Sequence, residues 1–181
     1  IIHTNDVHGR IVEEKGVIGD AKLAAVIEEE RKNNPSTLVV DAGDAFQGLP
    51  ISNSSKGEER AKLLNEMGYD AMAVGNHEFD FGLDEAKKYK EILNFPLLSS
   101  NTYVNGARLF EASTIVDKDK NVVGDEFVVI GVTTPETATK THPKNVQGVT
   151  FKDPISEVNS VIDEVEARAA AEGKTYKNYV V

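Results

Sequence analysis

Short apolar runs alternate with longer amphipathic stretches along the whole chain. Runs of apolar and β-branched residues predict six strands, at residues 1–4, 37–41, 71–74, 96–100, 127–132 and 178–181. Apolar residues at helical spacing predict four helices, at residues 20–33, 58–67, 82–93 and 154–171. Because most strands are followed by a helix, the pattern is typical of a layered α/β domain.

Polar and special residues mark the ends of these helices. We expect Asp20 to be the N-cap of the first helix and Pro35 to stop it. Gly68 is expected to end the second helix, since glycine is common just after a helix C-terminus. In the last helix the charged face, which includes Glu157, is expected to be solvated.

Two stretches depart from the alternation. Residues 108–132 predict a β-hairpin with a polar turn at 117–121. That turn lacks the glycine and the terminal glutamate of an EF-hand loop in register, so calcium is not expected there. Residues 133–151 hold two prolines and predict an irregular surface loop.

The size and composition of the chain limit its class. With 181 residues, 40% of them apolar and 28% charged, the chain has room for one globular domain. Its net charge of −10 argues against a nucleic-acid polymer or an anionic membrane as a partner. There are no cysteines, and no apolar run reaches the ~18 residues that a membrane helix needs. Both ends have the pattern of strands, so we expect a piece of a longer protein.

Residues that can bind metal directly follow the first predicted strand. Asp6 and His8 lie two positions apart, so in an extended segment their side chains would point the same way and could share one ion. The alternative is structural, with Asp6 capping a turn and His8 packing against it. The pair alone does not decide between these.

Two further loops carry similar chemistry. Asp44 follows Gly43, which permits a sharp turn, and its carboxylate could bridge two ions or serve the turn alone, while Asp41 is interpreted as structural. Asn76 and His77 stand in a polar segment that packing alone does not explain. Loops after strands at one sheet edge are where α/β proteins place ligands, so the three segments together favour a shared site.

Together these segments resemble the 5'-nucleotidase family of the calcineurin-like metallophosphoesterases. The resemblance is carried by TNDVHG at residues 4–9, GDAFQG at 43–48, GNHEFD at 75–80 and VIGVTTPET at 129–137, and it spans nearly the whole chain. It implies a layered α/β/β/α metallophosphoesterase domain, of which residues 1–181 would be the N-terminal portion, incomplete at its C-terminus.

The resemblance also implies roles for single residues. By similarity, Asp6 and His8 would hold a first metal ion, Asp44 would bridge two ions, and Asn76 would bind the second. His77 would stabilise the phosphoryl oxygens or protonate the leaving group, and Asp80 would orient its ring. The expected cofactors are two divalent ions, zinc or manganese before calcium, iron or cobalt.

The family pattern also requires metal ligands that this chain lacks. Further histidines, often with a glutamine, are expected beyond Val181, as is a covalently linked C-terminal substrate-binding domain. His142 matches no ligand position, and His3 is expected to face the core or pack beneath the site.

The implied function is hydrolysis of nucleoside phosphates to nucleoside and phosphate. Hydrolysis of 2',3'-cyclic nucleotides, nucleotide sugars or non-nucleotide esters, or a non-catalytic surface binding domain, stay open as alternatives. By resemblance, the expected location is extracellular, at the cell surface or periplasmic.

Overall fold

A parallel sheet and a mixed sheet form the centre of the fold in the computed structural model, which describes all 181 residues. The parallel sheet has the order β1 (Ile2–Thr4), β2 (Val39–Asp41), β3 (Ala71–Ala73), β4 (Leu97–Leu98). The mixed sheet has the order β10 (Asn178–Val180), β8 (Phe127–Ile130), β7 (Ser113–Val116). A small antiparallel sheet consists of β6 (Ala107–Arg108), β5 (Thr102–Val104) and β9 (Val149–Phe151).

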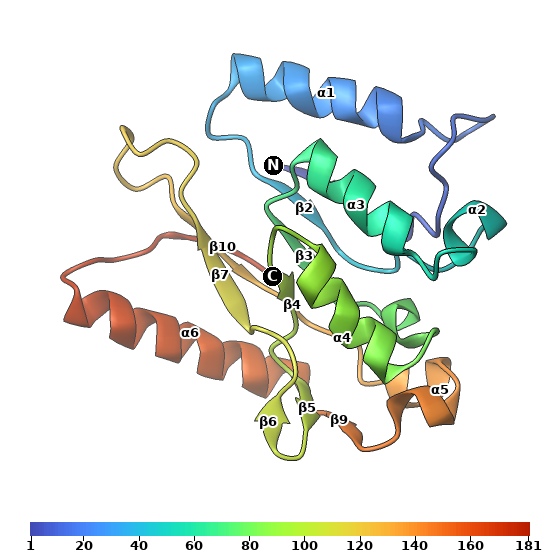
Figure 1. Ribbon diagram of the computed structural model, residues 1–181. Coiled ribbons are helices and arrows are strands. Elements are labelled where there is room, and N and C mark those ends of the chain that lie inside the picture. The colour runs from blue at the N-terminus through green and yellow to red at the C-terminus, as the bar shows by residue number, and fades with distance from the viewer.

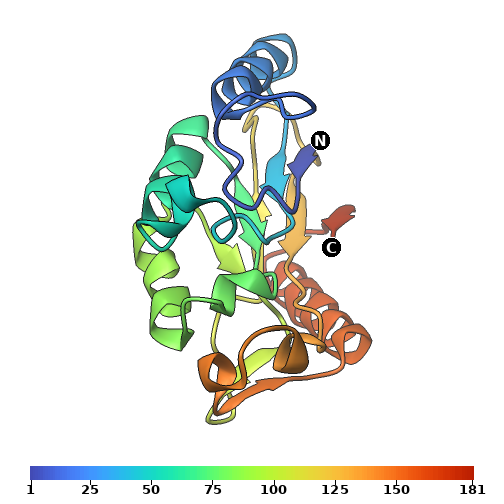
Figure 2. The ribbon, with the colours of Figure 1, turned by 90° about the vertical axis from the view of Figure 1, so that its right-hand side faces the viewer.

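Helices cover the outer faces of the two large sheets, which gives four layers (Figures 1 and 2). The helices are α1 (Asp20–Asn33), α2 (Pro50–Asn53), α3 (Glu58–Met67), α4 (Leu83–Ile92), α5 (Thr137–Lys140) and α6 (Pro154–Ala171), with 3₁₀ turns η1 (His77–Phe79) and η2 (Pro143–Val146). One apolar cluster fills the space between the parallel sheet and α1, α3 and α4. A second lies between the sheets, and a third joins the mixed sheet to α6. The predicted α/β/β/α layering is therefore confirmed.

Most predicted elements are present with small shifts at their ends. Helices α1, α3 and α6 have the predicted bounds, and Gly68 ends α3 in the left-handed conformation with φ 71°. The strands are shorter than predicted. The apolar pattern of each run extends past the last residue that pairs with a neighbouring strand. The predicted N-cap was wrong: Gly19 caps α1, and Asp20 instead pairs through its side chain with the buried Arg60.

Four other predictions need correction. The hairpin exists as antiparallel β7 and β8, but its second strand starts at Phe127, and Val123 in the connection is 98% exposed. Residues 133–151 contain α5, η2 and β9 rather than irregular chain alone. Glu157 on α6 is not simply solvated, because it accepts hydrogen bonds from Tyr103 and Arg108. His3 is exposed, since it projects from the edge strand β1.

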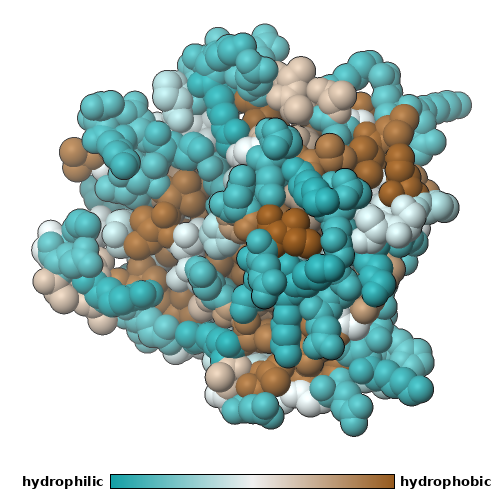
Figure 3. Space-filling view, viewed as in Figure 1, coloured by the Kyte–Doolittle hydropathy of each residue, from teal (hydrophilic) through white to brown (hydrophobic).

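The surface agrees with the acidic, polar composition. Figure 3 shows hydrophilic side chains over most of one face, with apolar side chains between them. None of the helices combines the length and the apolar composition of a membrane span.

Candidate metal centre

Three loops that follow β1, β2 and β3 meet at one edge of the parallel sheet. Since the strands are parallel, their carboxyl ends share that edge, and the loops continue side by side beyond it. The N–H of Asp6 donates to the carbonyl of Gly43 at 3.0 Å, and the N–H of His8 donates to the carbonyl of Asp44 at 3.0 Å. The first two loops are thus held together by main-chain hydrogen bonds.

Three of the predicted metal ligands have left-handed backbone conformations. The φ angles are 50° for Asp6, 49° for His8 and 59° for Asp44. The first loop is therefore not extended, and the predicted reason for the approach of Asp6 and His8 was wrong. Non-glycine residues in this region cost energy and are concentrated at functional sites, where surrounding contacts hold them in place.

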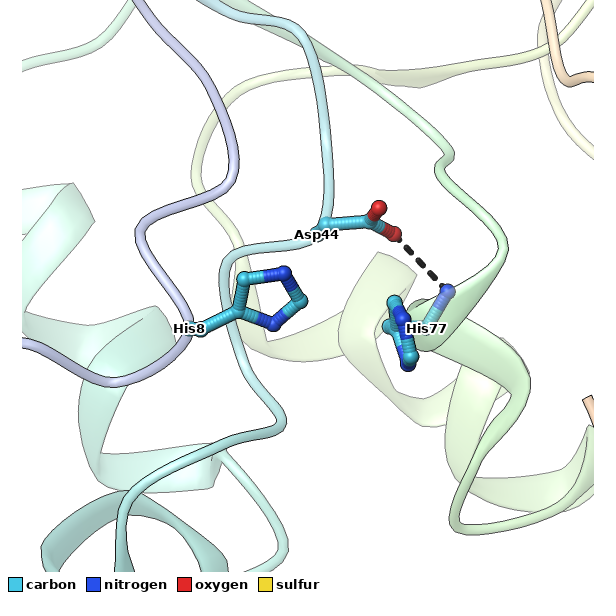
Figure 4. A group of neighbouring side chains, drawn as sticks. All are labelled: His8, Asp44 and His77. Carbon is cyan, nitrogen blue, oxygen red and sulfur yellow. Dashed lines mark hydrogen bonds between the residues drawn. The ribbon is translucent and has the colours of Figure 1, made fainter.

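His8, Asp44 and His77 converge on one point (Figure 4). Each offers a ligand atom, and these atoms all lie within 4.8 Å of one another. The two imidazole rings meet edge to face, with centroids 4.9 Å apart. One carboxylate with two imidazoles is a donor set suited to a divalent transition metal. His8 and Asp44 therefore fit the ions that the resemblance implies, whereas the resemblance assigns His77 to the phosphoryl group.

Both rings are oriented through their Nδ1 atoms. His8 Nδ1 lies 2.9 Å from the carbonyl oxygen of Gln47, which can only accept, so Nδ1 carries the proton and Nε2 is free to bind metal. His77 Nδ1 lies 2.6 Å from Asp80 Oδ2. Burial lowers the pKa of His77, but the hydrogen bond and charge of Asp80 and the charge of Asp44 outweigh it, so the pKa lies above its ordinary value.

Asp6 and Asn76 border this cluster. The Asp6 side chain is 60% exposed, and its Oδ1 lies 3.9 Å from His8 Nε2, outside the tight group. Asn76 is the N-cap of η1, and its half-buried side chain makes no capping hydrogen bond, which leaves its amide oxygen free. The structure therefore brings His8, Asp44 and His77 together and places the other two beside them.

Glu78 is a further residue of the site, and the sequence analysis gave it no role. Its side chain is fully buried, and its carboxylate accepts hydrogen bonds from the N–H groups of Asp44 (2.8 Å), Ala45 (3.0 Å) and Gly75 (2.7 Å). Burial, together with the charge of Asp44, raises the pKa of Glu78 to about 7. Glu78 thus joins the second and third loops. The position of Glu78 between His77 and the core residue Phe79 was the signal in the sequence that could have identified it.

Glycines allow these two loops to approach. Gly43 has φ 99°, and a Cβ there would lie 2.6 Å from the main-chain nitrogen of Gly75. A Cβ on Gly75 would in turn overlap Asp44 Oδ1. The distance between the Asp44 carboxylate and the third loop therefore depends on both glycines.

Asp41 is structural, as interpreted from sequence. It is buried, accepts from Thr4 Oγ1 at 2.5 Å, and accepts from the N–H of Gly43 at 2.8 Å. Burial raises its pKa to about 6. Its contacts fix the turn from which Asp44 projects.

Comparison with known proteins identifies the family of this chain. The model of the family described as calcineurin-like phosphoesterase matches residues 1–180. A 5'-nucleotidase of Vibrio cholerae is 40% identical over 175 residues, which cover 93% of this chain and 31% of that protein. A bovine 5'-nucleotidase is 36% identical, with 92% of this chain and 31% of that protein covered. The chain thus spans less than a third of these relatives.

Solved structures show the same fold. The calcineurin-like phosphoesterase YfkN of Bacillus subtilis superposes with a TM-score of 0.79 at 27% identity, covering 92% of this chain and 57% of that one. A 5'-nucleotidase precursor of Thermus thermophilus gives a TM-score of 0.76 at 31% identity, covering 92% and 34%. The family match, the shared fold and the strand-end cluster agree: the chain belongs to the calcineurin-like phosphoesterase family.

Proposed function

We propose that this chain is the N-terminal portion of a metal-dependent phosphomonoesterase that hydrolyses nucleoside phosphates. The convergence of His8, Asp44 and His77 from three strand-following loops carries the proposal. The relatives named 5'-nucleotidase support the nucleotide substrate.

In this proposal Asp6, His8, Asp44 and Asn76 belong to the shell of two divalent ions, zinc or manganese. Bound there, such ions supply a hydroxide nucleophile near neutral pH and stabilise charge on the transferred phosphoryl group. Further ligands would come from chain beyond Val181, as would a substrate-binding domain. The relatives are about three times as long as this chain, which supports that expectation.

His77 acts on the phosphoryl group and the leaving oxygen, and Asp80 orients its ring. Asp80 accepts from Nδ1, so the Nε2 edge of His77 is left to face the substrate. With its pKa raised, the ring is more readily protonated and can donate a charge-assisted hydrogen bond to a phosphoryl oxygen or a proton to the leaving group.

The test uses the full-length protein, loaded with manganese or zinc, and measures phosphate release from nucleoside 5'-monophosphates. His77→Ala is expected to lower kcat by about 100-fold or more, because it removes both the donor and the acid. The matched control is His3→Ala, since His3 is exposed on the edge strand β1 and lies in none of the three loops. Nucleotide binding without metal and without hydrolysis would contradict the proposal and favour a binding domain.

The same proposal makes a statement about the 181-residue chain by itself. Because part of each ion's shell would be missing, we expect weak metal binding and little hydrolysis from it. Turnover comparable to that of the full-length protein would contradict the division of the site between two parts of the protein. On the family resemblance we also propose a location outside the cytoplasm, at the cell surface or in the periplasm, which fractionation of producing cells tests.

A further inference from the structure

The segment from residue 133 to residue 152 connects β8 to α6, includes β9, and has no part in the function proposed above. It contains α5 and η2, and it lies beside the turn that carries His77 in two perpendicular views (Figures 1 and 2). We call it the 133–152 segment.

One buried side chain ties the two ends of this segment together. Asn101, which is 0% exposed, accepts from the N–H of Thr133 at 2.9 Å and donates to the carbonyl of Thr133 at 2.8 Å. The side-chain amide of Asn101 also donates to the main-chain carbonyl of Lys152 at 3.0 Å, and the N–H of Lys152 donates to the main-chain carbonyl of Asn101 at 2.9 Å. The segment is therefore a closed loop with a fixed base.

The start of the segment is bound to the strand that leads into the site. Thr133 is buried, and its hydroxyl donates to the carbonyl of Val74 at 2.7 Å. Val74 immediately precedes the GNHEFD segment. The base of the 133–152 segment is therefore held to the loop that follows β3.

The middle of the segment contacts Asp80. The hydroxyl of Thr141, which is 6% exposed, donates to Asp80 Oδ1 at 2.8 Å. The Asn145 side chain donates to the main-chain carbonyl of Asp80 at 2.8 Å. Since Asp80 Oδ2 faces His77 Nδ1 at 2.6 Å, each carboxylate oxygen has its own partner.

We propose that the 133–152 segment positions the His77–Asp80 pair and that Thr141 is its principal positioning residue. The inference rests on the proposed roles of His77 and Asp80. A carboxylate bound at one oxygen can still rotate about its Cβ–Cγ bond, whereas two bonds at opposite oxygens hold its plane. The imidazole that it orients is then held at the angle that the reaction needs.

The test compares three variants of the full-length protein. Thr141→Val removes the hydroxyl and keeps the shape, Thr141→Ser keeps the hydroxyl, and Thr139→Val makes the same change on α5 at an exposed residue that donates only to the carbonyl of Glu136. Thr141→Val is expected to lower kcat by about 10-fold, the effect of losing one hydrogen bond to a charged group, with KM and bound metal unchanged. The other two variants are expected to behave as wild type.

Any of three results would overturn the inference. Thr141→Val could have the kcat of the wild type, Thr141→Ser could lose as much kcat as Thr141→Val, or the loss of kcat could follow a loss of bound metal. Crystal structures of the full-length wild type and Thr141→Val add a readout that needs no turnover: the Asp80 carboxylate and the His77 ring are expected to rotate, and unchanged positions would contradict positioning. If the wild type hydrolyses nothing, the proposed function fails, while the structural comparison still decides whether Thr141 holds the pair.

Discussion

The close approach of Gly43 and Gly75 gives a stability prediction that can be calculated from the structure. Gly43→Ala places a Cβ at φ 99°, where a side chain costs roughly 1–2 kcal/mol. That Cβ would lie 2.6 Å from the nitrogen and 2.9 Å from the Cα of Gly75. Both are main-chain atoms, so relief requires the loops to separate, and such overpacking costs about 1–3 kcal/mol. The expected loss in the free energy of unfolding is about 2–5 kcal/mol in total.

Gly82→Ala is the matched control for this substitution. Gly82 has φ 97°, nearly that of Gly43, but a Cβ there has no atom within 4 Å. Only the backbone term of roughly 1–2 kcal/mol should therefore be lost. The difference between the two variants isolates the cost of the close approach.

Urea denaturation of the 181-residue chain, followed by circular dichroism, measures both losses. We expect Gly43→Ala to lose about 1–3 kcal/mol more than Gly82→Ala, with the same dependence on urea concentration. Equal losses would show that the second and third loops have room for a side chain between them. The argument that these glycines set the position of Asp44 would then be wrong.

Three further predictions concern the site and the ion pair between Asp20 of α1 and Arg60 of α3. Gly75→Ala should displace the Asp44 carboxylate, so full-length protein should bind less manganese by calorimetry, and unchanged affinity would contradict the overlap. Because the pKa of Glu78 is raised to about 7, its contribution to stability is full below pH 4.5 and is lost as pH rises to 7. Over that range the free energy of unfolding of the metal-free wild type should fall by up to about 3 kcal/mol relative to that of Glu78→Gln. Equal pH dependence of the two free energies of unfolding would refute this. Arg60→Ala should cost about 3–5 kcal/mol in urea denaturation, since Asp20 stays buried without a partner, and Asp20→Leu with Arg60→Met should restore most of it. A double variant as unstable as Arg60→Ala would contradict the pairing.

The sequence determined the main helices and the strands of the two large sheets, and it predicted where the candidate site would lie. Helices α1, α3 and α6 were predictable because their apolar residues recur at helical spacing and their ends carry polar, proline or glycine residues. The GNHEFD segment could be recognised because its polar side chains directly follow a buried strand, where a packed core does not require them.

Tertiary structure decided which polar groups are partners and in which conformation they meet. The left-handed backbone of Asp6 and His8 depends on hydrogen bonds to a loop nearly forty residues away, so no local pattern announces it. Glu78 has the same appearance in sequence as an exposed glutamate until its three N–H donors surround it. Likewise, the contact of Thr141 with Asp80 joins residues 61 positions apart. Periodicity along a chain records which face of an element is buried, whereas hydrogen-bond partners are set by packing between elements, and only the folded chain brings those together.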